Sequence, residues 1–199
     1  MAYIKESFKE LLFITLFFLS IQSSGQDQFF KQLADSALAL TKQHVIYDPS
    51  YFNIDYPGGD VPADKGVCTD VIIRAYRKMG IDLQKELHED IKANFDVYPQ
   101  KWGLDKPDKN IDHRRVPNLI VFFSRFGTEK PLSKKSGDYL PGDIVTWDLG
   151  GGITHIGIVV NKRSPGGEHH MVVHNIGNGQ VIEDCLFSYR ITGHFTYKK

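Results

Sequence analysis

Two residues of this sequence, Cys68 and His155, have types and surroundings that could carry out chemistry together. Cys68 stands at the start of a segment with helical periodicity, and His155 stands on an alternating segment, residues 154–160. A thiol attacks a carbonyl only as the thiolate, and a neighbouring imidazole can take the thiol proton and later protonate the leaving group. The pair therefore predicts a thiol-dependent hydrolase, provided that the fold brings the two residues together.

The expected environment of Cys68 suits a reactive thiol. In the first turn of a helix, unpaired backbone N–H groups and the helix dipole stabilise a thiolate, and the same N–H groups can bind an oxyanion. Cys68 also shares the apolar stripe of its helix, so we expect it to face the sheet that carries His155. The alternative is that Cys68 is only a small buried residue, which is common for cysteine.

A third residue should hold the His155 imidazole by accepting a hydrogen bond from its second ring nitrogen. His174 and Asn175 are the candidates, because they lie on the next expected strand of a hairpin. Neighbours on a strand point to opposite faces, so only one of them can face the site. Periodicity leaves this choice open.

Charged residues near the expected site could bind substrate. Arg114 and Arg115 are candidates because a guanidinium recognises a carboxylate through two parallel hydrogen bonds. The alternative for both is a loop clamp made of salt bridges. Asp70 is a further candidate, although it lies one helical turn before Arg74 and is expected to pair with it.

The sequence favours no metal and no cofactor. His155, His169, His170 and His174 fall within twenty residues. Neither a His-Glu-x-x-His motif nor paired Cys-x-x-Cys motifs accompany them, so the spacing is not that of a common metal site.

The elements that must position these residues are helices in the first half and strands in the second. Apolar periodicity predicts helices over residues 28–43, 66–79, 83–95 and 117–126. Short alternating segments then predict strands over residues 144–147, 156–160, 171–174, 180–182 and 191–197. Short glycine- and asparagine-containing connections indicate hairpins, so the sequence predicts an α+β domain with a mostly antiparallel sheet.

Composition and the N-terminus define the setting. The chain has 199 residues, which favours one domain, and its formal net charge of +0 gives no sign of nucleic-acid binding. Residues 1–25 carry lysines, then an apolar run, then small residues, which is the pattern of a secretory signal peptide. We expect a single exported domain over residues 27–199, periplasmic or extracellular, monomeric, and without a membrane span after cleavage. An uncleaved anchor is the alternative.

Export also makes the two cysteines, Cys68 and Cys185, a possible disulfide pair. A domain of this size does not need such a bridge. Acidic neighbours, Glu183 and Asp184, should raise the pKa of Cys185, so we expect it to be a poor nucleophile.

Five motifs follow one another along the chain: Tyr56-Pro57-Gly58-Gly59, Val67-Cys68-Thr69, Pro141-Gly142-Asp143-Ile144-Val145, His155-Ile156-Gly157-Ile158-Val159 and Val173-His174. Their order is similar to that of the NlpC-type cell-wall peptidases, a circularly permuted branch of the papain-like fold. Three longer segments cover residues 67–75, 111–119 and 173–177. These segments look like signatures of the bacterial family catalogued as domain of unknown function 1287, a resemblance that covers about residues 27–199.

The resemblance implies a papain-like α+β domain with its nucleophile helix packed on a C-terminal antiparallel sheet. It implies Cys68 as nucleophile, His155 as base and His174 as the orienting residue, with Tyr56 near the oxyanion site and Asn175 in support. The acidic residue that precedes the thiol in those peptidases is replaced by Val67.

Two functions follow as expectations. The first is an exported cysteine amidase or peptidase that hydrolyses amide bonds of peptidoglycan stem peptides, or another amide substrate, through a Cys68 acyl-enzyme. The second is a non-catalytic cell-envelope binding protein on the same fold, in which Cys68 is inert or bridged to Cys185. A related acyl transfer to or from a non-wall substrate is a third possibility.

Overall fold

A six-stranded antiparallel sheet occupies the second half of the chain, in a computed structural model that describes residues 28–199. The predicted signal segment, residues 1–25, therefore lies outside the described residues. The strand order is β3-β8-β4-β5-β6-β7, so the last strand returns to pair with β4 instead of extending the sheet beyond β7. The strands are β3 (Thr128–Glu129), β4 (Ile144–Asp148), β5 (Thr154–Arg163), β6 (His170–His174), β7 (Val181–Glu183) and β8 (Arg190–Thr196).

The four predicted helices are confirmed, the first three with shorter ends and the fourth beginning one residue earlier than predicted. Residues 28–40 are helical, and they are followed by α2 (Cys68–Lys78), α3 (Leu83–Ala93) and α4 (Val116–Phe126). The first helix ends three residues before its predicted end, because residues 41–43 form a turn. The predicted ends of α2 and α3 were too late by one and two residues. The helix α2 also begins two residues after its predicted start, because Gly66 belongs to an extended pair. That pair consists of β1 (Ile46–Tyr47) and β2 (Lys65–Gly66), which run parallel.

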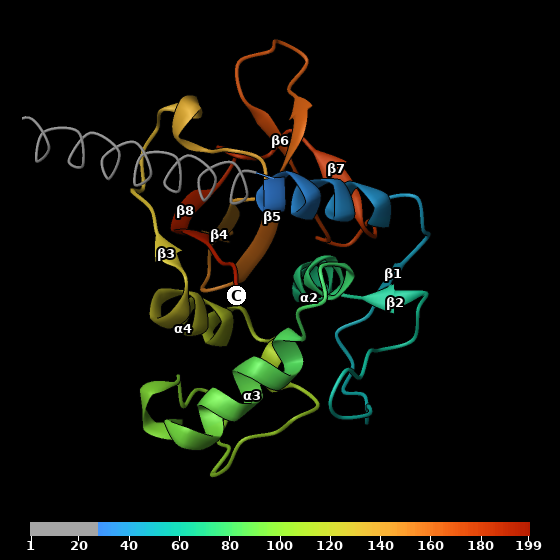
Figure 1. The fold of residues 1–199 in the computed structure, drawn as a ribbon, viewed down its shortest axis with the longest axis vertical. Helices are drawn as coiled ribbons and strands as arrows, with labels where there is room; N and C mark the ends of the chain where they lie inside the picture. Colours follow the sequence, from blue (N-terminus) through green and yellow to red (C-terminus); the bar gives the residue numbers. More distant parts are fainter. Residues whose placement is uncertain (1–27) are drawn as a thin grey trace, which may run out of the picture.

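Helices cover one face of the sheet, which we call the inner face. Residues 28–40, α2 and α4 pack there against apolar side chains of β5, whereas α3 packs on α2 and α4 and lies away from the sheet (Figure 1). A smaller cluster fills the opposite, outer face and includes Val145, Trp147 and Val159. Because successive side chains of a strand alternate, β4, β5 and β6 each contribute to both clusters. The α+β prediction with an antiparallel sheet is thus confirmed.

Within residues 28–199, the helices are all too short or too polar to cross a membrane.

Candidate active site

Cys68 is the first residue of α2, as the sequence predicted, and its side chain is packed against the sheet. The residue is 8% exposed and belongs to the inner-face core. The main-chain N–H of Ile156 donates a hydrogen bond to the sulfur, and the N–H groups of Thr69 and Cys68 also point to it. Burial outweighs these donors and raises the pKa of the Cys68 thiol to about 12. The resting thiol is therefore protonated at neutral pH.

His155 and His174 lie on the outer face of β5 and β6 and form a hydrogen-bonded chain with a carboxylate. His155 Nε2 lies 2.8 Å from His174 Nδ1, and His174 Nε2 lies 3.0 Å from Glu183 Oε2. Both imidazoles are buried, whereas the Glu183 side chain is 38% exposed. Of the two candidates that the sequence left open, His174 contacts His155.

The donors and acceptors of this chain follow from its carboxylate end. Burial lowers the pKa of His174, with Glu183 acting in the opposite direction, so the imidazole is neutral at neutral pH. Since a carboxylate only accepts, His174 Nε2 carries the proton, and His174 Nδ1 must then accept from His155 Nε2. The ring nitrogen of His155 that remains free to act as a base is Nδ1.

Cys68 and His155 are neighbours through the main chain and make no direct hydrogen bond among the described residues. The sulfur contacts the N–H of Ile156, the residue that follows His155 on β5. Burial, together with the neighbouring His174, lowers the pKa of His155 to about 3. With a neutral thiol and a neutral imidazole, the resting pair is not a thiolate–imidazolium ion pair. Catalytic hydrogen bonds in proteins without substrate are often long and become short only in the complex.

Gly157 brings His174 and His155 together. A Cβ atom at this position would lie 2.6 Å from Val172 Cγ1 and 3.2 Å from the His174 Cβ. The absence of a side chain on β5 thus lets β6 approach closely enough for the two imidazoles to bond.

Asn175 supports the site from another direction. Its side-chain amide donates to the carbonyl of Gly66 at 3.1 Å and is fully buried. Gly66 ends β2, two residues before Cys68, so Asn175 ties the start of α2 to the end of β6.

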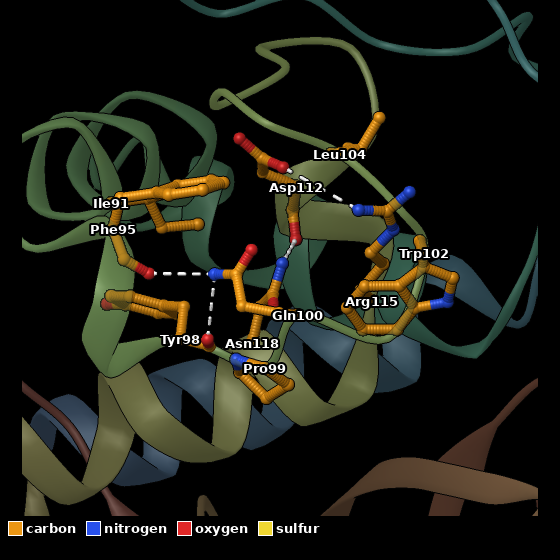
Figure 2. A pocket seen from close by; sticks show the side chains of 10 residues that line it. All are labelled: Ile91, Phe95, Tyr98, Pro99, Gln100, Trp102, Leu104, Asp112, Arg115 and Asn118. Carbon is orange, nitrogen blue, oxygen red and sulfur yellow. Dashed lines mark hydrogen bonds and ion pairs between the residues drawn. The ribbon is translucent and has the colours of Figure 1, made fainter.

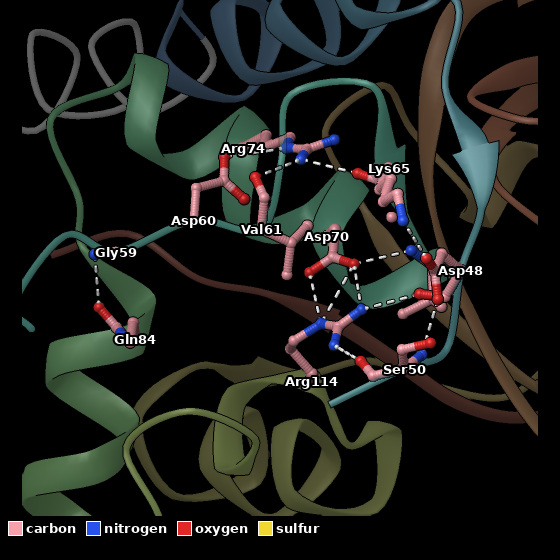
Figure 3. A network of polar contacts seen from close by, with 12 residues as sticks. Asp48, Ser50, Gly59, Asp60, Val61, Lys65, Asp70, Arg74, Gln84 and Arg114 are labelled. Carbon is pink, nitrogen blue, oxygen red and sulfur yellow. Dashed lines mark hydrogen bonds and ion pairs between the residues drawn. The ribbon is translucent and has the colours of Figure 1, made fainter. Parts of the chain in front are cut away.

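Arg114 and Asp70 form a buried clamp rather than a free substrate-binding pair. Arg114 Nε lies 3.1 Å from Asp70 Oδ1, and the two terminal nitrogens of Arg114 donate to the carbonyls of Ser50 and Asp48 (Figure 3). Asp70 also accepts from the Val67 N–H at 2.7 Å, which caps α2. The donors of Arg114 are thus used by the protein itself.

The expected pair between Asp70 and Arg74 is wrong. Arg74 instead bonds to Asp60 and to the carbonyls of Val61 and Lys65, because the loop before α2 folds back over the helix (Figure 3). Arg74 and Arg114 thereby hold the two ends of this loop against α2.

Arg115 differs from Arg114 because no carboxylate makes a close ion pair with its guanidinium. Its guanidinium lies 4.1 Å from the centre of the Trp102 ring, and the nearest carboxylate oxygen, on Asp112, is 4.0 Å away (Figure 2). Burial lowers the pKa of Arg115, although Asp112 raises it. Arg115 and Trp102 line a pocket of about 240 Å³ together with Cys68. Arg115 is thus the predicted arginine that retains free donors beside the thiol.

Tyr56 lies away from Cys68. Its hydroxyl donates to Glu89 of α3, and its ring packs edge-on against His88. Tyr47 of β1 occupies the place expected for a site tyrosine, since it lines the same pocket as Cys68. Sequence reasoning missed Tyr47 because a two-residue parallel pairing leaves no periodic signal.

Glu183 and Cys185 were also missed as neighbours of the site. In the β6–β7 hairpin His174 pairs with Val181, which puts Glu183 at the diagonal position on the same face. The register of the β6–β7 hairpin is the feature from which the position of Glu183 beside His174 could have been predicted. Cys185 Sγ lies 3.6 Å from His174 Nε2, and both cysteines are free thiols on opposite faces of the sheet.

Comparison with known proteins agrees with one of the expected resemblances. A family described as "Domain of unknown function (DUF1287)" matches residues 34–197. The chain is also similar to "Uncharacterized protein YijF" of Escherichia coli (strain K12), with 51% identity over 165 residues, which is 83% of this chain and 80% of that protein.

Proposed function

The chain belongs to the DUF1287 family, whose description assigns no activity, and we propose from its site that it is a cysteine hydrolase of amide bonds. One observation supports this most strongly. A thiol at a helix N-terminus lies beside a strand whose histidine is oriented by a second histidine and a carboxylate. This is the division of roles that nucleophilic catalysis needs, with a nucleophile, a base and a group that fixes the base.

The proposed reaction begins from neutral groups. Cys68 packs on the inner face and His155 lies on the outer face near the start of β5, so the reaction requires the Cys68 side chain to turn toward that end of the strand when substrate binds. The thiol then gives its proton to His155 Nδ1 as the sulfur attacks the amide carbonyl, and a thioester forms when His155 protonates the leaving amine. Water then hydrolyses the thioester with His155 again acting as base. The N–H groups at the start of α2 and the Tyr47 hydroxyl are the donors proposed for the oxyanion.

The substrate class follows from the pocket. Its volume of about 240 Å³ suits a short peptide segment, and Arg115 offers free donors to a carboxylate. Peptidoglycan stem peptides combine amide bonds with free carboxylates, so we propose them as the substrate of an exported enzyme. The papain-like, NlpC-type fold belongs to this proposal, because a helix-borne thiol over an antiparallel sheet is the arrangement it implies.

Digestion of purified stem peptides, with product analysis by mass spectrometry, tests the proposal. We expect cleavage by the wild type, none by Cys68→Ala, unchanged cleavage by Cys185→Ala, and a decrease of about 10²–10⁴-fold in His155→Ala. A thioester on Cys68 should be trapped by rapid acid quenching. Cleavage that persists in Cys68→Ala would contradict the proposal.

The burial of Cys68 favours a second candidate, a non-catalytic binding protein of the cell envelope. Because Cys68 and Cys185 are both free thiols, this candidate is proposed in the form in which Cys68 is inert and not bridged. This candidate predicts that stem peptides bind equally to the wild type and to Cys68→Ala and that neither protein cleaves them.

A further inference from the structure

We propose that His174, Glu183 and Cys185 form a zinc site on the outer face of the sheet, and that bound zinc stops the Cys68 reaction by reversing the tautomer of His155. The described residues hold one such group, in which a ring nitrogen, a carboxylate oxygen and a sulfur all lie within 4.8 Å of one another. The pocket that contains Cys68 does not include these residues.

The separation of nitrogen and sulfur fits a tetrahedral zinc ion, and the carboxylate oxygen lies within 4.8 Å of both atoms. Zn–S bonds of about 2.3 Å and Zn–N bonds of about 2.0–2.1 Å put nitrogen and sulfur roughly 3.6 Å apart at a tetrahedral angle. The observed distance from His174 Nε2 to Cys185 Sγ is 3.6 Å, and that from His174 Nε2 to Glu183 Oε2 is 3.0 Å. Small side-chain rotations would therefore complete a three-ligand site with an open fourth position.

The chemistry of the ligands and their surroundings also fits. Thiolate, imidazole and carboxylate together suit zinc better than magnesium or calcium, which prefer oxygen ligands alone. The second nitrogen of His174 is held by His155, as metal-binding histidines are usually held by an outer partner. Glu183 is 38% exposed, so an ion can enter from solvent on its side.

Zinc binding would reverse the hydrogen bond between the histidines. A metal needs the lone pair of His174 Nε2, so the proton must move to His174 Nδ1, which then donates to His155 Nε2. His155 then carries its own proton on Nδ1 and cannot accept one from Cys68. The two imidazoles hold two protons before and after, and the Cys185 thiol proton leaves to solvent. No group is oxidised or reduced.

Cobalt binding tests the site without reference to activity. Full-length protein, freed of metal with a chelator, is titrated with Co²⁺, whose bond to a thiolate gives a charge-transfer absorption in the near ultraviolet. We expect this absorption in the wild type and in Cys68→Ala, and its loss in Cys185→Ala and Cys185→Ser. Competition with Zn²⁺ then gives the zinc affinity.

Glu183→Gln should weaken zinc binding by at least about tenfold, since even outer partners of a metal site are worth about 10–100-fold. Asp184→Asn is the matched control, because Asp184 lies next in sequence but pairs with His169. Absorption that depends on Cys68 rather than Cys185, or equal weakening by both carboxylate variants, would overturn the site.

The inhibition rests on the proposed function and has its own measurement. Saturating Zn²⁺ should abolish stem-peptide cleavage by the wild type and leave Cys185→Ala active. Equal inhibition of both proteins would overturn the tautomer switch. If the metal-free wild type cleaves no amide substrate, the proposed function fails together with the switch, while the cobalt absorption still decides the metal site.

Discussion

The region that carries Cys68 and the region that carries His155 are held in place by different forces. The loop before α2 is fixed by buried ion pairs, in which Arg114 joins Asp70 to main-chain carbonyls. The outer face of the sheet holds His155 through hydrogen bonds between neutral rings that end at the half-exposed Glu183. We infer that changes in the first region should act mainly on folding stability, whereas changes in the second should act mainly on reactivity.

The largest expected effect is the loss of folding stability when the ion pair between Arg114 and Asp70 is broken. Arg114→Ala leaves the Asp70 carboxylate buried without its partner, and the side chains are 1% and 3% exposed. Removing one member of such a pair lowers the free energy of unfolding by about 3–5 kcal/mol. Urea denaturation followed by circular dichroism measures it.

Arg115→Gln is the matched control for this comparison. Its carboxylate partner is 4.0 Å away, so the change should lower the free energy of unfolding by no more than about 1 kcal/mol. An equal decrease in the free energy of unfolding in both variants would contradict the conclusion that Arg114 is a structural clamp and Arg115 a pocket residue.

A smaller decrease in folding stability is expected from Gly157→Ala, because Gly157 lies on β5, the strand that both regions share. The added methyl would lie 2.6 Å from Val172 Cγ1, so β6 must move or the side chains must repack. Such overpacking lowers the free energy of unfolding by about 1–3 kcal/mol. It should also lengthen the contact between His155 and His174, which a crystal structure of the variant would show. Gly137→Ala, where the added methyl meets no atom within 4 Å, is the control.

The two regions also differ in how far the sequence predicted them. The helix that starts at Cys68 and the strand that carries His155 came from periodicity, because their apolar positions record which face is buried. The partner of Arg114, the pairing of Tyr47 beside Gly66 and the place of Glu183 depend on chain segments that meet only in the folded state. Periodicity carries no information on such contacts, so Tyr47 was missed, whereas Tyr56 was expected near the site only from the resemblance of its motif.

The pH dependence of Cys68 alkylation tests the neutral resting state. Because burial raises the pKa of Cys68 to about 12, the thiolate is a small fraction at neutral pH. Its fraction should rise about tenfold per pH unit between roughly pH 7 and 9, and the rate with iodoacetamide should rise with it. Peptide mapping separates Cys68 from Cys185. A rate that is already constant in mild acid would indicate an ion pair with His155 instead.

The smallest effect is expected at the exposed end of the histidine chain. Glu183→Gln keeps an oxygen that can accept from His174 Nε2, so the tautomer that leaves His155 Nδ1 free is preserved. A buried triad carboxylate behaves otherwise, since its amide replacement lowers kcat about 10⁴-fold by imposing the wrong tautomer. Because the Glu183 side chain is 38% exposed, the amide that replaces its carboxylate can turn, and water can screen the lost charge. We therefore expect stem-peptide cleavage to decrease by no more than about tenfold. A much larger decrease would mean that the charge of Glu183 stabilises a protonated His174 during the reaction, and that the proton of Cys68 passes beyond His155.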